Sequence, residues 1–403
     1  MKKAFILTAI SLGMAFAGNV QAVEVDLLGN VDVHGFVSQG YMKSQDNNYL
    51  ANNSSDGTFG FNEVGINFSK QLTDQLRIGL QLFSRDLGAI GNNKIELDWA
   101  FADYRWKDWL GLRAGKIKAP FGLYNEIRDT DMLRTSIFLP QSVYNEIIRD
   151  TMVGLKGIGF YGDIPAGPAG GFSYYLLGGT NDVNGDEDVG AVRYFNSQPL
   201  TRVTGDFDFG KSYIASLEWR PPLDGLLLKY GYLITEVKVP AEIAGQAATY
   251  EADKQVMYLY SVEYTWNNLV LAAELMKSRG DYSVDIPAFG GIVKDALRKE
   301  LGYYVSAAYR FNDWFEAGTY YSKYYPDSTD KDGDDGLASG INMYDYQGWL
   351  EDYALSLRFD INEYLVAKVE GHLMDGAALC LAFDNDDFKE HWYMFAAKLS
   401  FSF

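Results

Sequence analysis

Two copies of a short charged motif lie close together in the first half of the chain. The sequence YNEIRDT occupies positions 124–130, and YNEIIRDT occupies positions 144–151. The oppositely charged side chains in these motifs could do two kinds of chemistry: they could pair with each other, or they could present a local electric field to a charged solute. The second copy contains one additional isoleucine, which shifts Arg149 by one position relative to Tyr144. The two copies therefore cannot present their charges identically.

The motifs begin and end a long connection, residues 119–152, with an unusual composition. Long connections without secondary structure are usually functional or disordered, and disordered segments are polar. This connection instead contains many apolar residues, among them Phe121, Met132 and Ile137. We expect the apolar side chains to pack on a wall of the molecule and the charged ones to face water. The charged candidates are Glu126, Arg128, Asp129, Asp131, Arg134, Glu146, Arg149 and Asp150.

The elements that must position this connection are short segments in which apolar and polar residues alternate. Tyr353, Leu355 and Leu357 occupy one face of such a segment, and Ser356 and Arg358 occupy the other. Side chains of a strand point to opposite faces with a period of two, so this pattern indicates strands. The same alternation recurs in residues 76–83, 258–266 and 391–403.

Short and long connections between the expected strands alternate along the chain. Short periplasmic turns and longer extracellular loops are typical of transmembrane barrels. The pattern predicts an all-β fold, a transmembrane antiparallel β-barrel of about 16 strands with the third long connection folded inward. Sixteen strands leave room for a water-filled lumen, whereas about eight do not. The long connections are expected at about 44–57, 87–93, 119–152, 182–210, 238–255, 278–299, 326–349 and 377–390.

The N-terminal residues and the overall charge narrow the class further. Lys2 and Lys3 precede an apolar run that is too short to span a bilayer, and Val20-Gln21-Ala22 follows as a cleavage site. We therefore expect a signal peptide over residues 1–22 and a barrel domain over 23–403. The chain carries 54 acidic and 35 basic residues, which argues against nucleic acid as a partner.

On these features the chain resembles the Gram-negative outer-membrane porins. It ends on a strand with Phe403, and its third long connection follows the fifth strand, where porins carry a constriction loop. Residues 115–126, GKIKAPFGLYNE, are similar to a stretch of the phosphate-selective porin superfamily. The chain has no run of arginine or lysine along the channel, which departs from the phosphate-selective members. The resemblance implies a homotrimer that contacts outer-membrane lipids and lipopolysaccharide and passes small hydrophilic solutes and ions.

In such a channel, charges at the constriction and along the lumen set ion preference through their local field and through size exclusion. The charges of the third connection are the first candidates, although Arg128–Asp129 and Arg149–Asp150 could instead be structural pairs that hold the connection to the wall. Single charges on the wall are more often generic lining groups. The wall candidates are Arg77, Glu96, Asp98, Lys116, Lys118, Glu274, Arg358, Lys368, Glu370 and Lys398.

Two acidic connections suggest a different chemistry, the binding of Ca²⁺ or Mg²⁺ by carboxylates. Neither contains the glutamate at the twelfth position of an EF-hand loop, so solvated acidic loops are the alternative. No other cofactor is expected. The candidate ligands are Asp182, Asp186 and Asp188 in one connection and Asp330, Asp332 and Asp334 in the other.

Catalysis has little support, because His34, His372 and His391 lack a recognisable serine signature nearby. The expected function is a non-enzymatic channel for passive diffusion, constricted by residues 119–152. Two alternatives remain open. One is a barrel scaffold around a periplasmic electron-transfer partner, which predicts a wider lumen, and the other is a surface receptor or adhesin that acts through its long loops.

Overall fold

The polar and apolar faces of the strands form the two sides of one closed sheet. The computed structural model describes residues 31–50 and 53–403, so the expected signal peptide lies outside the described part. In strand β16 (Leu365–Gly376), Lys368 and Glu370 are each 1% exposed, whereas Leu373 on the opposite face is 66% exposed. In β15 (Leu350–Asp360), Ser356 is 1% exposed and Leu355 is 59% exposed. Apolar side chains therefore cover the outside of the sheet, and polar ones are turned inward.

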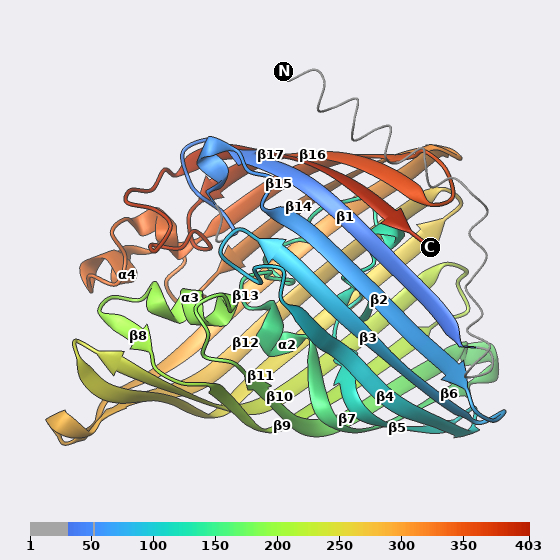
Figure 1. Cartoon of the computed structure of the whole chain (residues 1–403), viewed down its shortest axis with the longest axis horizontal. Coiled ribbons are helices and arrows are strands. Elements are labelled where there is room, and N and C mark those ends of the chain that lie inside the picture. Colours follow the sequence, from blue (N-terminus) through green and yellow to red (C-terminus); the bar gives the residue numbers. More distant parts are fainter. Residues whose placement is uncertain (1–30, 51–52) are drawn as a thin grey trace.

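Sixteen long strands pair antiparallel with their neighbours in the chain, and the first pairs with the last to close the barrel. They run obliquely around it (Figure 1). The predicted all-β class and strand number are confirmed. Besides β15 and β16, the long strands are β1 (Asp32–Ser44), β2 (Phe61–Gln71), β3 (Leu76–Leu87), β4 (Ile95–Lys107), β5 (Leu110–Lys118), β6 (Gly154–Pro165), β7 (Gly171–Val183), β9 (Phe207–Arg220), β10 (Leu226–Ile243), β11 (Gln246–Trp266), β12 (Leu269–Ile286), β13 (Gly291–Asn312), β14 (Phe315–Tyr325) and β17 (His391–Ser402).

The remaining elements lie in the connections. A three-residue strand, β8 (Thr201–Val203), pairs with the far end of β10. No helix in the described part of the chain is long and apolar enough to cross a membrane. The short helices are α2 (Arg149–Met152), α3 (Gly190–Asn196) and α4 (Asp334–Ala338), and the 3₁₀ turns are η2 (Ser54–Asp56), η3 (Asn125–Ile127), η4 (Asp131–Leu133), η5 (Gly167–Ala169), η6 (Pro287–Phe289) and η7 (Asp345–Gly348).

Two of the expected long loops are wrong. Residues 238–255 and most of 278–299 continue the ladders of β10–β11 and β12–β13 instead. The first hairpin turns at Ala244 and Gly245, whose φ angles of 51° and 77° fit the tight turn that joins twisted strands. Pro240, which has no backbone N–H to donate to a ladder, nevertheless lies within it and is the register partner of Thr249. Figure 1 shows both hairpins projecting at the end of the barrel where α3 and α4 lie.

The main buried apolar cluster joins the β5–β6 segment (residues 119–153) to the inward faces of the strands. It includes Ile137, Phe138 and Tyr144 from the segment, together with Leu259 of β11 and Met394 of β17. Burial of each such side chain stabilises the fold by about 1.5–3 kcal/mol. This packing explains why a long connection can be so apolar.

Candidate functional site

The two copies of the charged motif bind each other. Arg128 of the first copy lies 2.6 Å from the Glu146 carboxylate of the second, and Arg149 of the second pairs with Asp129 of the first. The side chains of Arg128, Asp129 and Arg149 are only 2–3% exposed. The structure therefore pairs each arginine with an acidic residue of the other copy in crossed ion pairs, whereas the structural alternative had expected the pairs Arg128–Asp129 and Arg149–Asp150. Their effect on ion preference remains a prediction.

The crossed pairs keep their carboxyl groups ionised. Burial alone would raise the pKa of Glu146, but Arg128, Arg149 and Arg85 outweigh it and lower the pKa to about 2. Burial would also raise the pKa of Asp129, yet Arg149 and Lys118 hold it well below its ordinary range. A buried carboxylate is stable only with such partners, because an unpaired charge in the interior costs several kcal/mol.

One side of the segment is held by β15 and β16. The carboxylate of Glu370 accepts hydrogen bonds from the backbone N–H groups of Ile137 (2.7 Å) and Phe138 (3.0 Å). Ser356 donates to the same carboxylate at 2.6 Å, and a ring nitrogen of His372 lies 3.0 Å from it. Glu370, expected to line the lumen, instead fixes the backbone of the segment.

Basic residues of β15–β17 hold the same stretch. Lys368 donates to the backbone oxygen of Asp131 at 2.6 Å and lies 3.1 Å from its carboxylate. Lys398 lies 3.6 Å from that carboxylate, and Arg358 donates to the backbone oxygen of Met132 at 2.7 Å. Burial would raise the pKa of Asp131, but Lys368 and Lys398 hold it well below its ordinary range. These wall cations act on the segment, since Lys368 is 1% exposed.

A second side of the segment is held by β10 and β12. Glu274 accepts a hydrogen bond from the N–H of Leu123 at 2.9 Å and another from the hydroxyl of Tyr144. Lys229 donates to the backbone oxygen of Gly122 at 2.8 Å. The first residues of the segment and its second motif are therefore tied to the same wall.

The strands β3–β5 hold the third side. Arg85 lies 3.1 Å from both Glu146 and Asp150, so one wall arginine grips the second motif at two places. Lys118 bridges Asp98 at 3.1 Å and Asp129 of the first motif. The segment is thus anchored to strands from widely separated parts of the barrel.

A polar cavity of about 380 Å³ lies between the segment and the strands β3–β7. Its lining holds five basic and six acidic side chains, so neither sign dominates. Eight of these had been predicted as pore-lining or metal-binding residues, and the structure brings them together here. The eight are Glu96, Asp98, Lys116, Arg149, Asp150, Asp182, Asp186 and Asp188, and the others are Arg85, Lys94 and Lys156.

Three predicted pore-lining residues that have not been described above also lie outside this cavity. Arg77 pairs with Asp103 at 3.6 Å, and its side chain is 47% exposed. Glu126 is exposed on the first motif. Arg134 lies 3.4 Å from Asp131 and donates to the backbone of Ile137, so it stabilises the segment internally.

The acidic connections do not gather their predicted ligands around one point. Asp182 pairs with Lys156 at 2.8 Å, and Lys94 bridges Asp186 (3.2 Å) and Asp188 (2.8 Å). Asp330 accepts hydrogen bonds from backbone N–H groups at the start of α4, and Asp332 and Asp334 are exposed. In the first connection, lysine side chains occupy the positions near the carboxylates that a cation would take.

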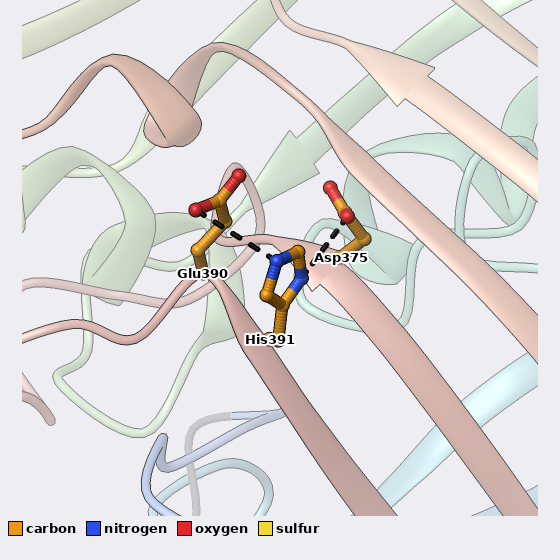
Figure 2. A group of neighbouring side chains, drawn as sticks. All are labelled: Asp375, Glu390 and His391. Carbon is orange, nitrogen blue, oxygen red and sulfur yellow. Dashed lines mark ion pairs between the residues drawn. The ribbon is translucent and has the colours of Figure 1, made fainter.

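Within residues 31–50 and 53–403, one group of three possible metal ligands meets, where β16 ends and β17 begins (Figure 2). His391 lies between Asp375, at 3.1 Å from Nδ1, and Glu390, at 4.0 Å from Nε2. Each ring nitrogen faces a different carboxylate, and the imidazole is 71% exposed. The exposed ring and its contacts with two separate carboxylates suit a solvated surface cluster.

Sequence reasoning missed Arg85, Lys94 and Lys156. The signal for Arg85 was present, since it has the same strand parity as Arg77 and Gln81 in β3. Lys94 lies in a connection, and its contact with Asp188 spans ninety-four positions of the chain. No local pattern could have indicated that pair.

Comparison with known proteins gives the fold a wider context. No family model matches the chain, and no curated protein matches it. Solved structures do resemble it. One is OmpF of Salmonella typhi in complex with daunomycin, with 14% sequence identity and a TM-score of 0.59, where the match covers 93% of this chain and 97% of that chain. Also similar is the outer membrane channel DcaP of Acinetobacter baumannii, with 13% identity, a TM-score of 0.56, and coverage of 93% of this chain and 97% of that chain. OprB of Pseudomonas putida has 12% identity, a TM-score of 0.52, and coverage of 93% of this chain and 94% of that chain. The shared feature is the fold, a closed antiparallel barrel of porin type.

Proposed function

We propose that the protein is an outer-membrane channel through which small hydrophilic solutes and ions diffuse passively, narrowed by the β5–β6 segment inside the lumen. The observation that carries the proposal is the anchoring of this segment to β3–β5, β10–β12 and β15–β17. Contacts with wall strands all around a closed barrel fit a segment that crosses its interior. The polar cavity beside it offers charged and hydrated surface to a permeating solute.

The outer surface of the barrel supports a membrane location. Large apolar side chains such as Leu355, Leu373 and Tyr393 are more than half exposed. Exposed tryptophans, Trp109, Trp266 and Trp314, stand at or beside three of the short turns, as in the aromatic belts at membrane interfaces. We propose the outer membrane as the location, with lipid and lipopolysaccharide as surroundings, and a homotrimer as the assembly.

The solved structures add a functional direction. One neighbour is described as an outer membrane channel, and another was solved with a small organic molecule, daunomycin. The scaffold alternative predicts an unobstructed lumen and is disfavoured by the anchored segment. A non-enzymatic role and divalent ions in the acidic connections remain predictions.

The test is reconstitution of the purified protein in planar lipid bilayers. We expect stepwise conductance increments, and a reversal potential in a KCl gradient that reports the cation-to-anion permeability ratio. A correctly folded barrel that gives no conductance steps would contradict the proposal. Cross-linking of the protein in detergent tests the trimer separately, since a monomeric channel would leave the diffusion function intact.

A further inference from the structure

A second cavity, of about 440 Å³, lies on the other side of the β5–β6 segment, against β9–β13. Its volume falls within the range of small-molecule sites, about 300–1,000 Å³. Aliphatic and aromatic side chains form most of its lining, including Leu155, Leu233, Met257 and Phe209. A path for hydrated ions gains nothing from such a surface, because apolar area left in contact with water costs about 25 cal/mol per Å².

The additional isoleucine of the second motif helps to build this cavity. Ile148, Thr151 and Met152 all contribute to its lining, and spacings of three and four place side chains on one face of a helical turn. Arg149 points away from them, toward Asp129 and over the ring of Phe83 at 4.6 Å. The inserted residue therefore allows one helical turn to show charge to one side and apolar surface to the other.

Aromatic rings from three elements form a further part of the lining. Phe195, the last residue but one of α3, contacts Phe207 at a ring-centroid distance of 5.2 Å and Tyr250 at 5.5 Å, with nearly perpendicular ring planes. All three residues line the cavity. Edge-to-face clusters of this kind offer faces and edges against which a planar apolar body can pack.

A cationic side chain also lines this cavity. Arg298 of β13 interacts with Tyr194 of α3, Tyr282 of β12 and Glu300 on its own strand face. Glu300 interacts with the same guanidinium, so a small inorganic anion gains less here than at an isolated arginine. An organic anion gains more, because its apolar body packs against the rings while its carboxylate accepts hydrogen bonds from the guanidinium.

We infer that this cavity is a binding site for amphipathic organic anions, namely monocarboxylates with an aromatic body. The inference deepens the proposed channel function by naming a solute class for one part of the lumen. Binding would concentrate such a solute beside the β5–β6 segment before it passes.

The test uses 2-naphthoate as the probe and the full barrel in detergent micelles, with binding measured by isothermal titration calorimetry. We expect saturable binding to the unaltered protein, and at least a tenfold weaker affinity in Arg298→Gln. The neutral analogue 2-naphthalenemethanol should bind both proteins equally, and inorganic phosphate should not compete. Arg279→Gln is the matched control, since Arg279 on β12 is 61% exposed and is not part of the cavity.

A second variant, Leu233→Trp, fills the cavity from the wall and should abolish binding of both naphthalene compounds. Retained β-sheet circular dichroism and heat-modifiable migration would show that each variant folds. Absence of saturable binding, equal naphthoate affinity in Arg298→Gln, or competition by phosphate would each overturn the inference. Because these measurements need no membrane, binding without conductance would reject the channel while leaving the site in place.

Discussion

The two cavities beside the β5–β6 segment are of similar size and opposite character. The polar one, against β3–β7, is surrounded by charges of both signs, and the apolar one, against β9–β13, is lined mainly by aliphatic and aromatic side chains. One segment separates them and contributes to both, through Arg149 and Asp150 on one side and Ile148 and Met152 on the other. One connection thus has a polar environment on one side and an apolar environment on the other.

The separation of the two cavities by the β5–β6 segment should depend most strongly on the crossed ion pairs. Asp129→Asn removes the carboxylate that Arg149 and Lys118 share, and loss of one member of a buried pair costs about 3–5 kcal/mol. We expect the segment to loosen, with larger and noisier single-channel currents in planar bilayers. Asp332→Asn, at an exposed aspartate, is the control. Currents identical to those of the unaltered protein would show that the pairs do not hold the segment.

Acidification should weaken the same pairs. The folded-state pKa of Glu146 is about 2, below the ordinary value of about 4.3, so its stabilising contribution is complete above about pH 4.3 and is lost as the pH falls through 2. Current recordings between pH 6 and pH 2 should show the transition only in the acidic part of this range. A transition centred above pH 5 would require a different group.

A charge introduced into the apolar cavity should affect solute binding there without affecting the polar cavity. Ile148→Glu places a carboxylate among apolar side chains, and an unpaired buried polar group costs about 1–3 kcal/mol. We expect naphthoate binding to fall at least tenfold, with an unchanged reversal potential in a KCl gradient. If the reversal potential shifts as strongly as the affinity, the cavities are not independent.

The smallest effect is expected in the polar cavity. Lys116→Gln combined with Lys156→Gln removes two cations from a nearly balanced lining, and a unit charge at 4 Å in water contributes about 1 kcal/mol. The cation-to-anion permeability ratio should rise by up to about fivefold, and by less in 1 M KCl because of screening. Reversal potentials measure this change directly. Naphthoate affinity should stay the same.

The barrel could be predicted from the sequence because its determinants are local. Alternation such as Leu355–Ser356–Leu357 specifies both a strand and the face that it turns to lipid. The two misplaced loops lie where polar residues weakened that signal in strands whose ladders nevertheless continue.

The site was less predictable because its contacts are distant in the chain. The sequence singled out the charged residues of the motifs as a group but not their partners: Arg149 pairs with Asp129, and Lys368 binds Asp131 across more than two hundred positions. The apolar cavity was not foreseen, although the inserted Ile148 was visible. The role of Ile148 depends on which residues lie beside the four-residue helix α2, and only the closed barrel brings those residues there.

The seam of the barrel has a consequence for how the protein is made. The N–H of Gly35 donates to the backbone oxygen of Phe403 at 3.0 Å, and the N–H of Phe403 donates back to Gly35 at the same distance. The ring therefore closes through a pairing that joins strands far apart in the chain, β1 and β17. Pairings over such separations form slowly, because the entropy of closing a long loop is lost before any contact compensates. Until closure, β1 and β17 both have unpaired edges that can pair with other chains, so slow closure leaves the folding chain open to aggregation at this seam.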